Sequence, residues 1–190
     1  AQLGVAIVPQ GGNTGLVGGS VPETRSNRPT VVLSLRRMNA IDVVDPAGLS
    51  LRAGAGAILA DVHAAAEAQG CRFPLSLGAK GSATIGGLVA TNAGGVQVLR
   101  HGTMRTLVRG LEAVLPDGTV LDQLAPLAKD NSGYDLKQLL IGAEGTLGVV
   151  TRVVLRLAPA QSARSIAWVG MASPDAALML LRRLRSRAGE

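Results

Sequence analysis

Residues 8–22 read VPQGGNTGLVGGSVP and follow directly on the apolar run GVAIV of residues 4–8. Glycine loses much conformational freedom on folding, so a cluster of glycines after a strand indicates that another group approaches the main chain closely. The backbone N–H groups of residues 11–15, with the short side chains of Asn13 and Thr14, are typical of a nest that binds phosphate without a lysine. The same residues also fit a long glycine-rich surface loop, and the local sequence leaves both interpretations open.

Two further segments have a similar character. Residues 74–95 read PLSLGAKGSATIGGLVATNAGG, in which glycines are flanked by Ser82, Thr84, Thr91 and Asn92. Two glycine-rich segments with small hydroxyl and amide side chains favour one extended ligand that lies between them. In the third segment, IGAEGTLGVVT at residues 141–151, the carboxylate of Glu144 is suited to accept a hydrogen bond from a ribose hydroxyl or a ring N–H. An isolated glutamate also commonly caps a turn.

Other sites of known chemistry are not supported by the sequence. A P-loop needs Gly-Lys followed by Ser or Thr, and no Gly-Lys pair occurs. A Rossmann fingerprint beginning at residues 54–56 would need a glycine where Leu59 stands. His63 and His101 have no partner at metal-ligand spacing, and we interpret both as structural.

Composition predicts a globular protein, because 47% of the residues are hydrophobic and 17% are charged. The formal net charge of +6 includes four arginines in the segment RRLRSR at residues 182–187. Only 2% of the residues are aromatic, so platforms for base stacking are scarce. We therefore expect a solvated basic surface and no nucleic-acid partner. A nucleic-acid-binding module stays as an alternative that predicts steep salt dependence.

Location follows from three features of the sequence. Cys71 is the single cysteine and indicates a reducing compartment. Residues 1–22 lack the basic leading region of a signal peptide, and residues 81–99 contain too many glycines for a membrane span. We expect a cytoplasmic protein without a transmembrane segment.

Periodicity predicts more strands than helices, and hence an α+β fold rather than a regular βαβ alternation. Strands are expected at 5–8, 30–35, 41–45, 49–54 and 148–159, and a hairpin at 111–122 around Asp117-Gly118. Helices are expected at 57–70, 134–142 and 174–187, the last with Ser173 as N-cap and Pro174 as its first residue.

The three glycine-rich segments, in this order and spacing, resemble the FAD-binding domain of the PCMH-type, or vanillyl-alcohol-oxidase, superfamily. Within it they are most similar to the FAD-linked D-2-hydroxyacid dehydrogenases, which act on 2-hydroxyglutarate, lactate or glycolate. The resemblance implies a fold with a mixed and antiparallel sheet. It also implies FAD as the cofactor, held noncovalently, because Asn13 and Thr14 lie in the loop where covalent members often carry a histidine.

By this resemblance three sets of residues would contact FAD. The first set, around the pyrophosphate, is Gln10, Gly11, Gly12, Asn13, Thr14, Gly15, Leu16, Gly19 and Ser20. The second set is Leu77, Gly78, Gly81, Ser82, Ile85, Gly86, Thr91, Asn92, Gly94 and Gly95. The third set, which would close the site, is Glu144, Gly145, Gly148 and Val149.

The resemblance also implies that the chain is incomplete at both ends. Residues 1–158 would be an FAD-binding domain that lacks its first βαβ segment, and residues 159–190 would be the start of a substrate-binding cap domain. We therefore assign no catalytic residue and no metal ligand within the chain. The implied partners are a 2-hydroxy acid and a separate electron acceptor. A related flavoenzyme with another alcohol substrate and a non-catalytic flavoprotein fragment remain as alternatives.

Overall fold

The structure is a computed structural model that describes residues 4–23, 27–163 and 165–188. The chain forms two compact units, Ala1–Ala160 and Gln161–Glu190. The domain boundary expected at residue 158 falls beside this division. The identity of the second part as the beginning of a cap domain stays a prediction.

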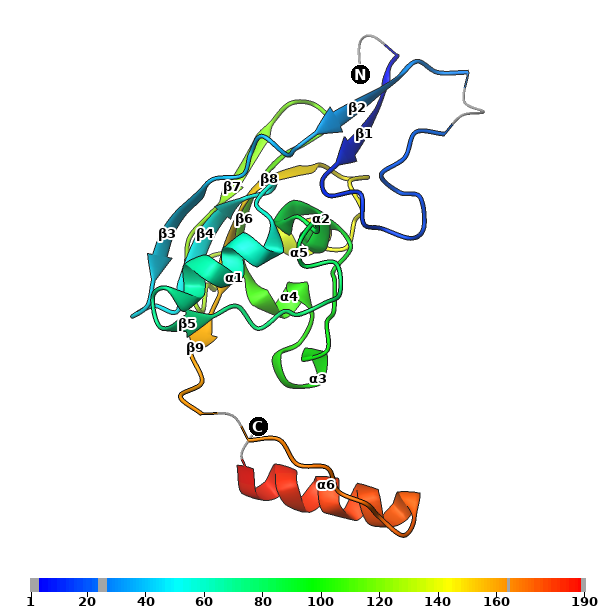
Figure 1. Cartoon of the computed structure of the whole chain (residues 1–190). Coiled ribbons are helices and arrows are strands. Elements are labelled where there is room, and N and C mark those ends of the chain that lie inside the picture. Colours follow the sequence, from blue (N-terminus) through cyan, green and yellow to red (C-terminus); the bar gives the residue numbers. More distant parts are fainter. Residues whose placement is uncertain (1–3, 24–26, 164, 189–190) are drawn as a thin grey trace. The chain divides into compact units, whose positions relative to one another are not determined.

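The first unit is a mixed α+β fold (Figure 1). Its strands are β1 (Ala6–Gln10), β2 (Thr30–Ser34), β3 (Ile41–Asp45), β4 (Ser50–Gly54), β5 (Cys71–Arg72), β6 (Val108–Val114), β7 (Val120–Gln123), β8 (Val149–Arg156) and β9 (Ala158–Pro159). Its helices are α1 (Leu59–Glu67), α2 (Ile85–Ala90), α3 (Val98–His101), α4 (Met104–Leu107) and α5 (Lys137–Leu140). The α+β class expected from the sequence is confirmed.

A five-stranded antiparallel sheet, in the order β3-β4-β8-β6-β7, is the centre of this unit. The turn between β6 and β7 is the predicted hairpin, in which Gly118 has a φ of +89°. The carboxylate of Asp117 accepts a hydrogen bond of 2.9 Å from the backbone N–H of Thr119. The strand of this sheet that comes last in the sequence, β8, lies between β4 and β6, so it joins two earlier parts of the chain that do not pair with each other.

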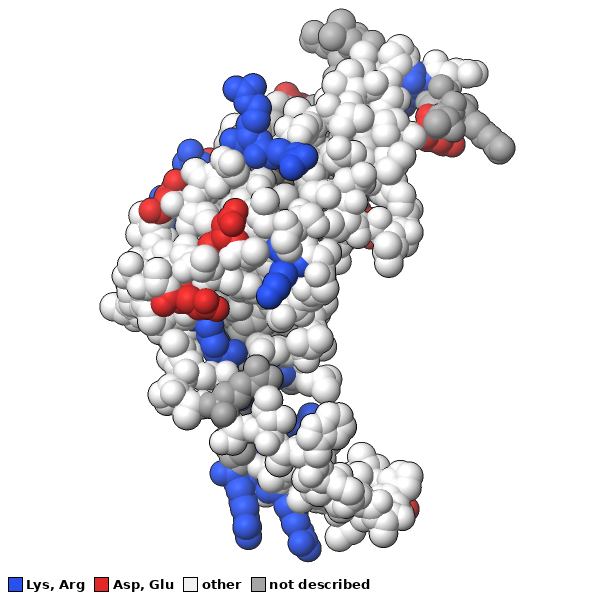
Figure 2. Space-filling model, in the orientation of Figure 1, with Lys and Arg blue, Asp and Glu red and all other residues white. Residues whose placement is uncertain are grey.

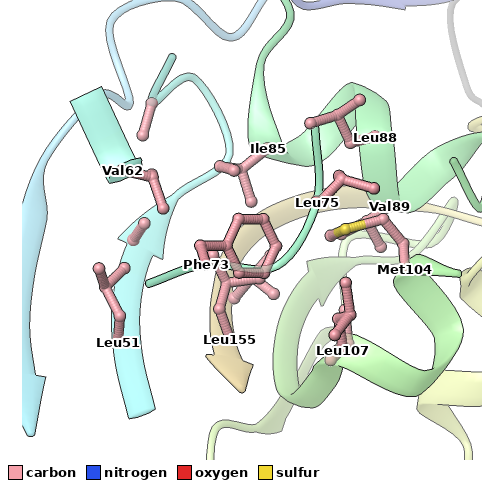
Figure 3. Close-up of a cluster of buried hydrophobic side chains, with 14 of the residues drawn as sticks. Leu51, Val62, Phe73, Leu75, Ile85, Leu88, Val89, Met104, Leu107 and Leu155 are labelled. Atoms are coloured by element: carbon pink, nitrogen blue, oxygen red, sulfur yellow. The ribbon is translucent and has the colours of Figure 1, made fainter. Parts of the chain in front are cut away.

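One face of the sheet carries the hydrophobic core, and α1 and α2 pack on that face (Figure 1). Figure 3 shows Leu51 and Leu155 of the sheet meeting Val62, Phe73 and Ile85. Phe73 is the one aromatic residue among the described members of the core. Aliphatic side chains therefore supply the burial, at roughly 1.5–3 kcal/mol for each large one.

A small parallel pair, β1 with β2, precedes the sheet in sequence and runs in register from Ala6 opposite Thr30 to Gln10 opposite Ser34. It ends where the first glycine-rich segment begins. A two-stranded pair has little stability by itself in water, so packing against the rest of the unit must hold it.

Most predicted elements are present, and the larger differences involve helices. Among the strands, β5 was not predicted, and the strand expected at 148–159 is divided into β8 and β9. The helix expected at 134–142 is only Lys137–Leu140. Helices α2, α3 and α4 were not predicted, because glycines, a single turn of length, or both hide a helical pattern. In α2, glycine is required at position 86, since a Cβ there would lie 2.6 Å from the Cβ of Ala55.

The second unit contains α6 (Pro174–Ala188). Its predicted cap is confirmed: the hydroxyl of Ser173 accepts a hydrogen bond of 3.2 Å from the backbone N–H of Ala176. Most of the large apolar side chains of this unit are exposed, Trp168 at 99% among them.

Candidate functional site

The first glycine-rich segment forms an uncharged, exposed loop after β1. Within the described part of the chain, none of the backbone N–H groups of residues 11–20 donates a hydrogen bond to another residue. Side chains brace the loop across its base: Gln10 Nε2 donates to the carbonyl of Ser20 at 2.8 Å, and Ser20 Oγ donates to Asn13 Oδ1 at 2.8 Å. Asn13 has a φ of +53°, a conformation that turns successive N–H groups toward one side. The loop therefore presents free backbone N–H donors, and two side-chain hydrogen bonds stabilise its conformation.

The start of this loop packs tightly against the second segment. A Cβ on Gly11 would lie 2.1 Å from Thr84 Oγ1, and one on Gly12 would lie 1.9 Å from the carbonyl oxygen of Ser82. Glycine is therefore required at both positions by contact between two parts of the chain. Any contact that Gly11 and Gly12 make with a ligand would come in addition to this packing.

The hydroxyl of Thr84 lies at this junction without a partner. Thr84 is 3% exposed, and its Oγ1 makes no hydrogen bond among the described residues. An unsatisfied buried hydroxyl costs about 1–3 kcal/mol, so its persistence indicates a role that the folded chain alone does not show. Thr84 was named among the flanking hydroxyls but not among the predicted site residues.

The third segment joins the other two through backbone contacts. The N–H of Glu144 donates to the carbonyl of Ala90 at 2.9 Å, at the end of α2. The carboxylate of Glu144 reaches the first loop, where Oε2 would lie 3.5 Å from a Cβ on Gly19. A Cβ on Gly145 would lie 3.2 Å from Pro9 Cγ, in β1. Three segments that are separated by up to 130 residues therefore meet at one place.

Arg105 connects the second and third segments, and sequence reasoning missed it. Its backbone N–H donates to Asn92 Oδ1 at 2.9 Å. Its Nη1 donates to the carbonyl and side-chain oxygens of Gln138, at 2.6 and 2.9 Å, and its Nη2 donates to the carbonyl of Ile141. The pattern around residue 105 gives no signal for this, because the partners lie 13 to 36 residues away in the sequence.

Open positions and packed positions alternate among the predicted site residues. A Cβ on Gly15, Gly78 or Gly81 would meet nothing within 4 Å, so these positions border open space. Leu16 is 99% exposed beside them. These are the places where a large ligand has room.

The other predicted residues are more enclosed. Ile85 and Gly86 are buried in the core, so a side-chain contact of Ile85 with a ligand is not available. Gly95 packs against the carbonyl of Ser76. Leu77, against the core, and Gly148 and Val149, at the start of β8, are half-buried. Thr91 and Gly94, by contrast, are exposed: the hydroxyl of Thr91 donates to the carbonyl of Gly87, and Gly94 lies near Val98.

Both histidines lie outside this place. His63 Nε2 is 2.8 Å from the carbonyl oxygen of Leu75. His101 Nε2 is 3.2 Å from Arg72 Nη2, and burial, with the positive charges of Arg72 and Arg100 next, lowers the pKa of His101. A neutral His101 is therefore favoured, with Nε2 as acceptor for the guanidinium of Arg72.

The convergent segments fit a dinucleotide such as FAD by their chemistry. Free backbone donors match the phosphate oxygens, the Thr84 hydroxyl lacks a partner, and open glycines leave space for a long ligand. Figure 2 shows the first loop as an uncharged surface, so main-chain dipoles rather than lysines would meet the phosphates. Which of the predicted residues touch the cofactor stays a prediction.

Comparison with known proteins supports the resemblance seen in the sequence. Residues 1–123 match the family described as FAD binding domain. The chain is 47% identical over 189 residues to D-2-hydroxyglutarate dehydrogenase, mitochondrial, of Bos taurus. That alignment covers 100% of this chain and 34% of the Bos taurus protein. It is 42% identical over 186 residues to the D-2-hydroxyglutarate–pyruvate transhydrogenase of Saccharomyces cerevisiae, covering 98% of this chain and 37% of that protein.

A solved structure confirms the fold. The structure of an alkyldihydroxyacetonephosphate synthase aligns with a TM-score of 0.75 and 26% identity, covering 85% of this chain and 29% of that chain. The present chain spans about a third of the length of the curated relatives that it matches.

The expected cytoplasmic location is wrong. The relatives from Bos taurus, Danio rerio and Arabidopsis thaliana are all named as mitochondrial enzymes. A single cysteine indicates reducing conditions but contains no targeting information, so it could not distinguish one reducing compartment from another. Among the described helices, none has the length and apolar character needed to cross a bilayer.

The converging glycine-rich segments, the α+β fold and the family match over residues 1–123 lead to one conclusion: this chain belongs to the FAD binding domain family and is homologous to the D-2-hydroxyglutarate dehydrogenases.

Proposed function

We propose that this chain is the cofactor-binding part of an FAD-dependent oxidoreductase that oxidises a D-2-hydroxy acid such as 2-hydroxyglutarate, lactate or glycolate. The observation that carries the proposal is the meeting of three glycine-rich segments around free backbone donors, in a chain 47% identical to a D-2-hydroxyglutarate dehydrogenase. The substrate and the electron acceptor would be met by parts of the protein outside residues 1–190.

In this proposal each segment has its own task. The free N–H groups of residues 11–20 bind the pyrophosphate, and the N–H groups and hydroxyls of residues 77–95 line the rest of the cofactor. The carboxylate of Glu144 accepts a hydrogen bond from a ribose hydroxyl. Attachment is noncovalent, because the loop offers Asn13 and Thr14 but no histidine or cysteine to form a bond with the flavin.

Bound FAD would supply a hydride acceptor for carbon 2 of the hydroxy acid, while a base would take the hydroxyl proton, so that a 2-oxo acid and reduced flavin would result. Residues of this chain would hold and orient the cofactor through main-chain donors and the Thr84 hydroxyl. Because the main-chain donors are fixed by the fold, little reorganisation accompanies binding.

The cofactor site is tested by titrating the chain with FAD and following flavin absorption and fluorescence. A shifted flavin band with quenched fluorescence is expected. A Cβ on Gly81 would meet no atom within 4 Å, so the variant Gly81→Leu should weaken FAD binding at least tenfold by filling open space while leaving thermal unfolding of the FAD-free chain unchanged. Gly170→Leu is the matched control, since Gly170 also borders open space but lies in the second unit, and it should bind FAD normally. Equal affinity for all three proteins would contradict the site.

The substrate class is tested separately in the complete protein. D-2-hydroxyglutarate, D-lactate and glycolate should bleach the flavin band under anaerobic conditions, and the L-enantiomers of the first two should not. Bound FAD that none of these acids reduces would reject the substrate class and leave the cofactor site intact. That result would favour an enzyme with another alcohol substrate, as the 26% identity to an alkyldihydroxyacetonephosphate synthase permits.

A further inference from the structure

The sheet face that does not carry the core borders a large cavity. Its volume is about 1070 Å³. Its floor consists of residues from β4, β6 and β8, and its wall is the chain from Asp122 to Gln138, which leaves β7 and passes over the sheet. At Gly110 of β6, next to the lining residue Arg109, a Cβ would lie 2.4 Å from the carbonyl oxygen of Gln123, so the start of the wall lies close to this strand.

Two arginines stand on the floor as diagonal neighbours. Arg52 of β4 is opposite Val154 of β8, and Arg156 lies two residues further along β8, so both side chains point away from the core. Cβ atoms in such a diagonal relation are about 7–8 Å apart. Like charges at this spacing repel, and an anion bound between the two arginines would relieve that repulsion.

A third arginine is turned onto the same face by a β-bulge. The pairing of β6 with β8 shifts between Val108 and Gly110, so Arg109 is the extra residue. Bulges commonly re-aim a side chain in this way. Arg109 lines the cavity, and its Nη1 donates a hydrogen bond to the carbonyl of Gly48. Three neighbouring strands thus each bring one guanidinium to the cavity.

The acidic residues of the cavity do not neutralise these arginines. Asp135 forms an ion pair of 2.5 Å with Lys137, on the wall. Asp130 accepts hydrogen bonds from the backbone and hydroxyl of Ser132, and Asp122 accepts one from the N–H of Leu124. Within the described ranges, no hydrogen bond or ion pair is found for the side chains of Arg52 and Arg156. The cavity lining carries five Lys or Arg and three Asp, a net charge of +2.

We propose that this cavity is a second ligand site, for a small anion that carries two or more carboxylate or phosphate groups. Guanidinium groups bind both kinds of oxyanion through paired hydrogen bonds, and a rigid sheet holds them at fixed separation. The volume suits a small molecule. Because the floor is the face of the sheet away from α1 and α2, the site is distinct from the place where the glycine-rich segments meet. The inference rests on FAD binding by this chain only for its test, and it does not depend on the substrate proposed for the whole protein.

Isothermal titration of the FAD-saturated chain at low ionic strength tests this, with citrate and pyrophosphate as separate probes and acetate as the monovalent control. Citrate or pyrophosphate should bind, acetate should not, and the better probe identifies carboxylate or phosphate as the preferred group. Arg52→Gln and Arg156→Gln should each weaken binding about tenfold, the loss of one charge-assisted contact. For the unaltered chain, a tenfold higher salt concentration should also weaken the binding of citrate or pyrophosphate, because salt screens the charges.

Arg152→Gln is the matched control, because Arg152 is an exposed arginine of the same strand that does not line the cavity. It should change affinity less than twofold. No binding of either polyanion to the unaltered chain would overturn the proposal, and so would an Arg152→Gln effect equal to the other two. Flavin absorption recorded on every variant shows whether it still folds and holds FAD.

Discussion

At the residue scale, glycine serves two different purposes within one loop. Gly12 touches the carbonyl of Ser82, whereas Gly15, three residues later, borders open space. Composition alone treats the two as equivalent. The difference is set by what the folded chain brings beside each position, and it separates packing from ligand binding.

Alanine substitution should therefore have opposite effects at these two positions. Gly12→Ala places a Cβ 1.9 Å from the carbonyl oxygen of Ser82 and should lower the free energy of unfolding by about 1–3 kcal/mol. Gly15→Ala meets no atom and restricts the unfolded chain, so it should leave stability unchanged or raise it by about 0.5 kcal/mol. Urea unfolding of the FAD-free chain measures both, and equal destabilisation would show that the loop does not pack as described.

His101 should make stability depend on pH between about 7 and 5. Burial and neighbouring arginines lower its pKa in the folded chain, so the unfolded chain takes up the proton first as the pH falls through the unfolded value of 6.5. Stability is then fully present above that pH and decreases below it. In His101→Gln, whose amide oxygen can still accept from Arg72, the urea midpoint should fall less between pH 7.5 and pH 5.5. A variant with an undiminished fall would assign the pH dependence to the carboxylates.

At the element scale, Arg105 controls how the end of α2 meets the segment before β8. Arg105→Met removes the guanidinium but keeps much of the aliphatic stem, so the carbonyls of Gln138 and Ile141 lose their donor. We expect a loss of about 2–4 kcal/mol in stability and faster hydrogen exchange at the amides of Gly142 and Glu144. Hydrogen exchange at the amides of β4 should become faster only by the amount that the lower global stability accounts for. Unchanged exchange at residues 142 and 144 would show that their bonds to α2 suffice without Arg105.

Strands were more predictable than helices because of how each is encoded. The segment IDVVD gives β3 at its predicted limits, Ile41–Asp45, since β-branched residues favour a half-buried strand. Helix α2 has two glycines in six residues, and its pattern opposes helix formation. Tertiary packing overrides that preference, because only glycine fits at position 86 against Ala55.

The site was predictable as three segments but not as a geometry. Glycines, hydroxyls and their order indicated the segments and the cofactor. The approach of residues 11 and 12 to residues 82–84, and the role of Arg105, depend on contacts across long sequence separations that no local pattern contains. The cavity on the other sheet face was likewise hidden, because its arginines look like ordinary alternating surface residues in the sequence.

At the scale of the whole molecule, the candidate cofactor site and the hydrophobic core both belong to the first unit. Every described member of the core cluster precedes residue 158. A chain ending at Ala160 should therefore bind FAD with the same affinity as the 190-residue chain and unfold at the same urea concentration. Circular dichroism and flavin fluorescence on the two proteins measure this. A weaker or less stable shortened chain would show that residues 161–190 contribute to the first unit.

The position of β8 has a consequence for biosynthesis. Strands β3 and β4 form one hairpin and β6 and β7 form another, and both leave an edge that only residues 149–156 can cover. A ribosome must therefore synthesise almost the whole unit before either edge is paired. Until then, two strand edges with unpaired backbone N–H and C=O groups are exposed on the nascent polypeptide and can pair with other chains. Chains interrupted before residue 149 should aggregate or engage chaperones, while those that reach residue 156 can close the sheet in a single late step.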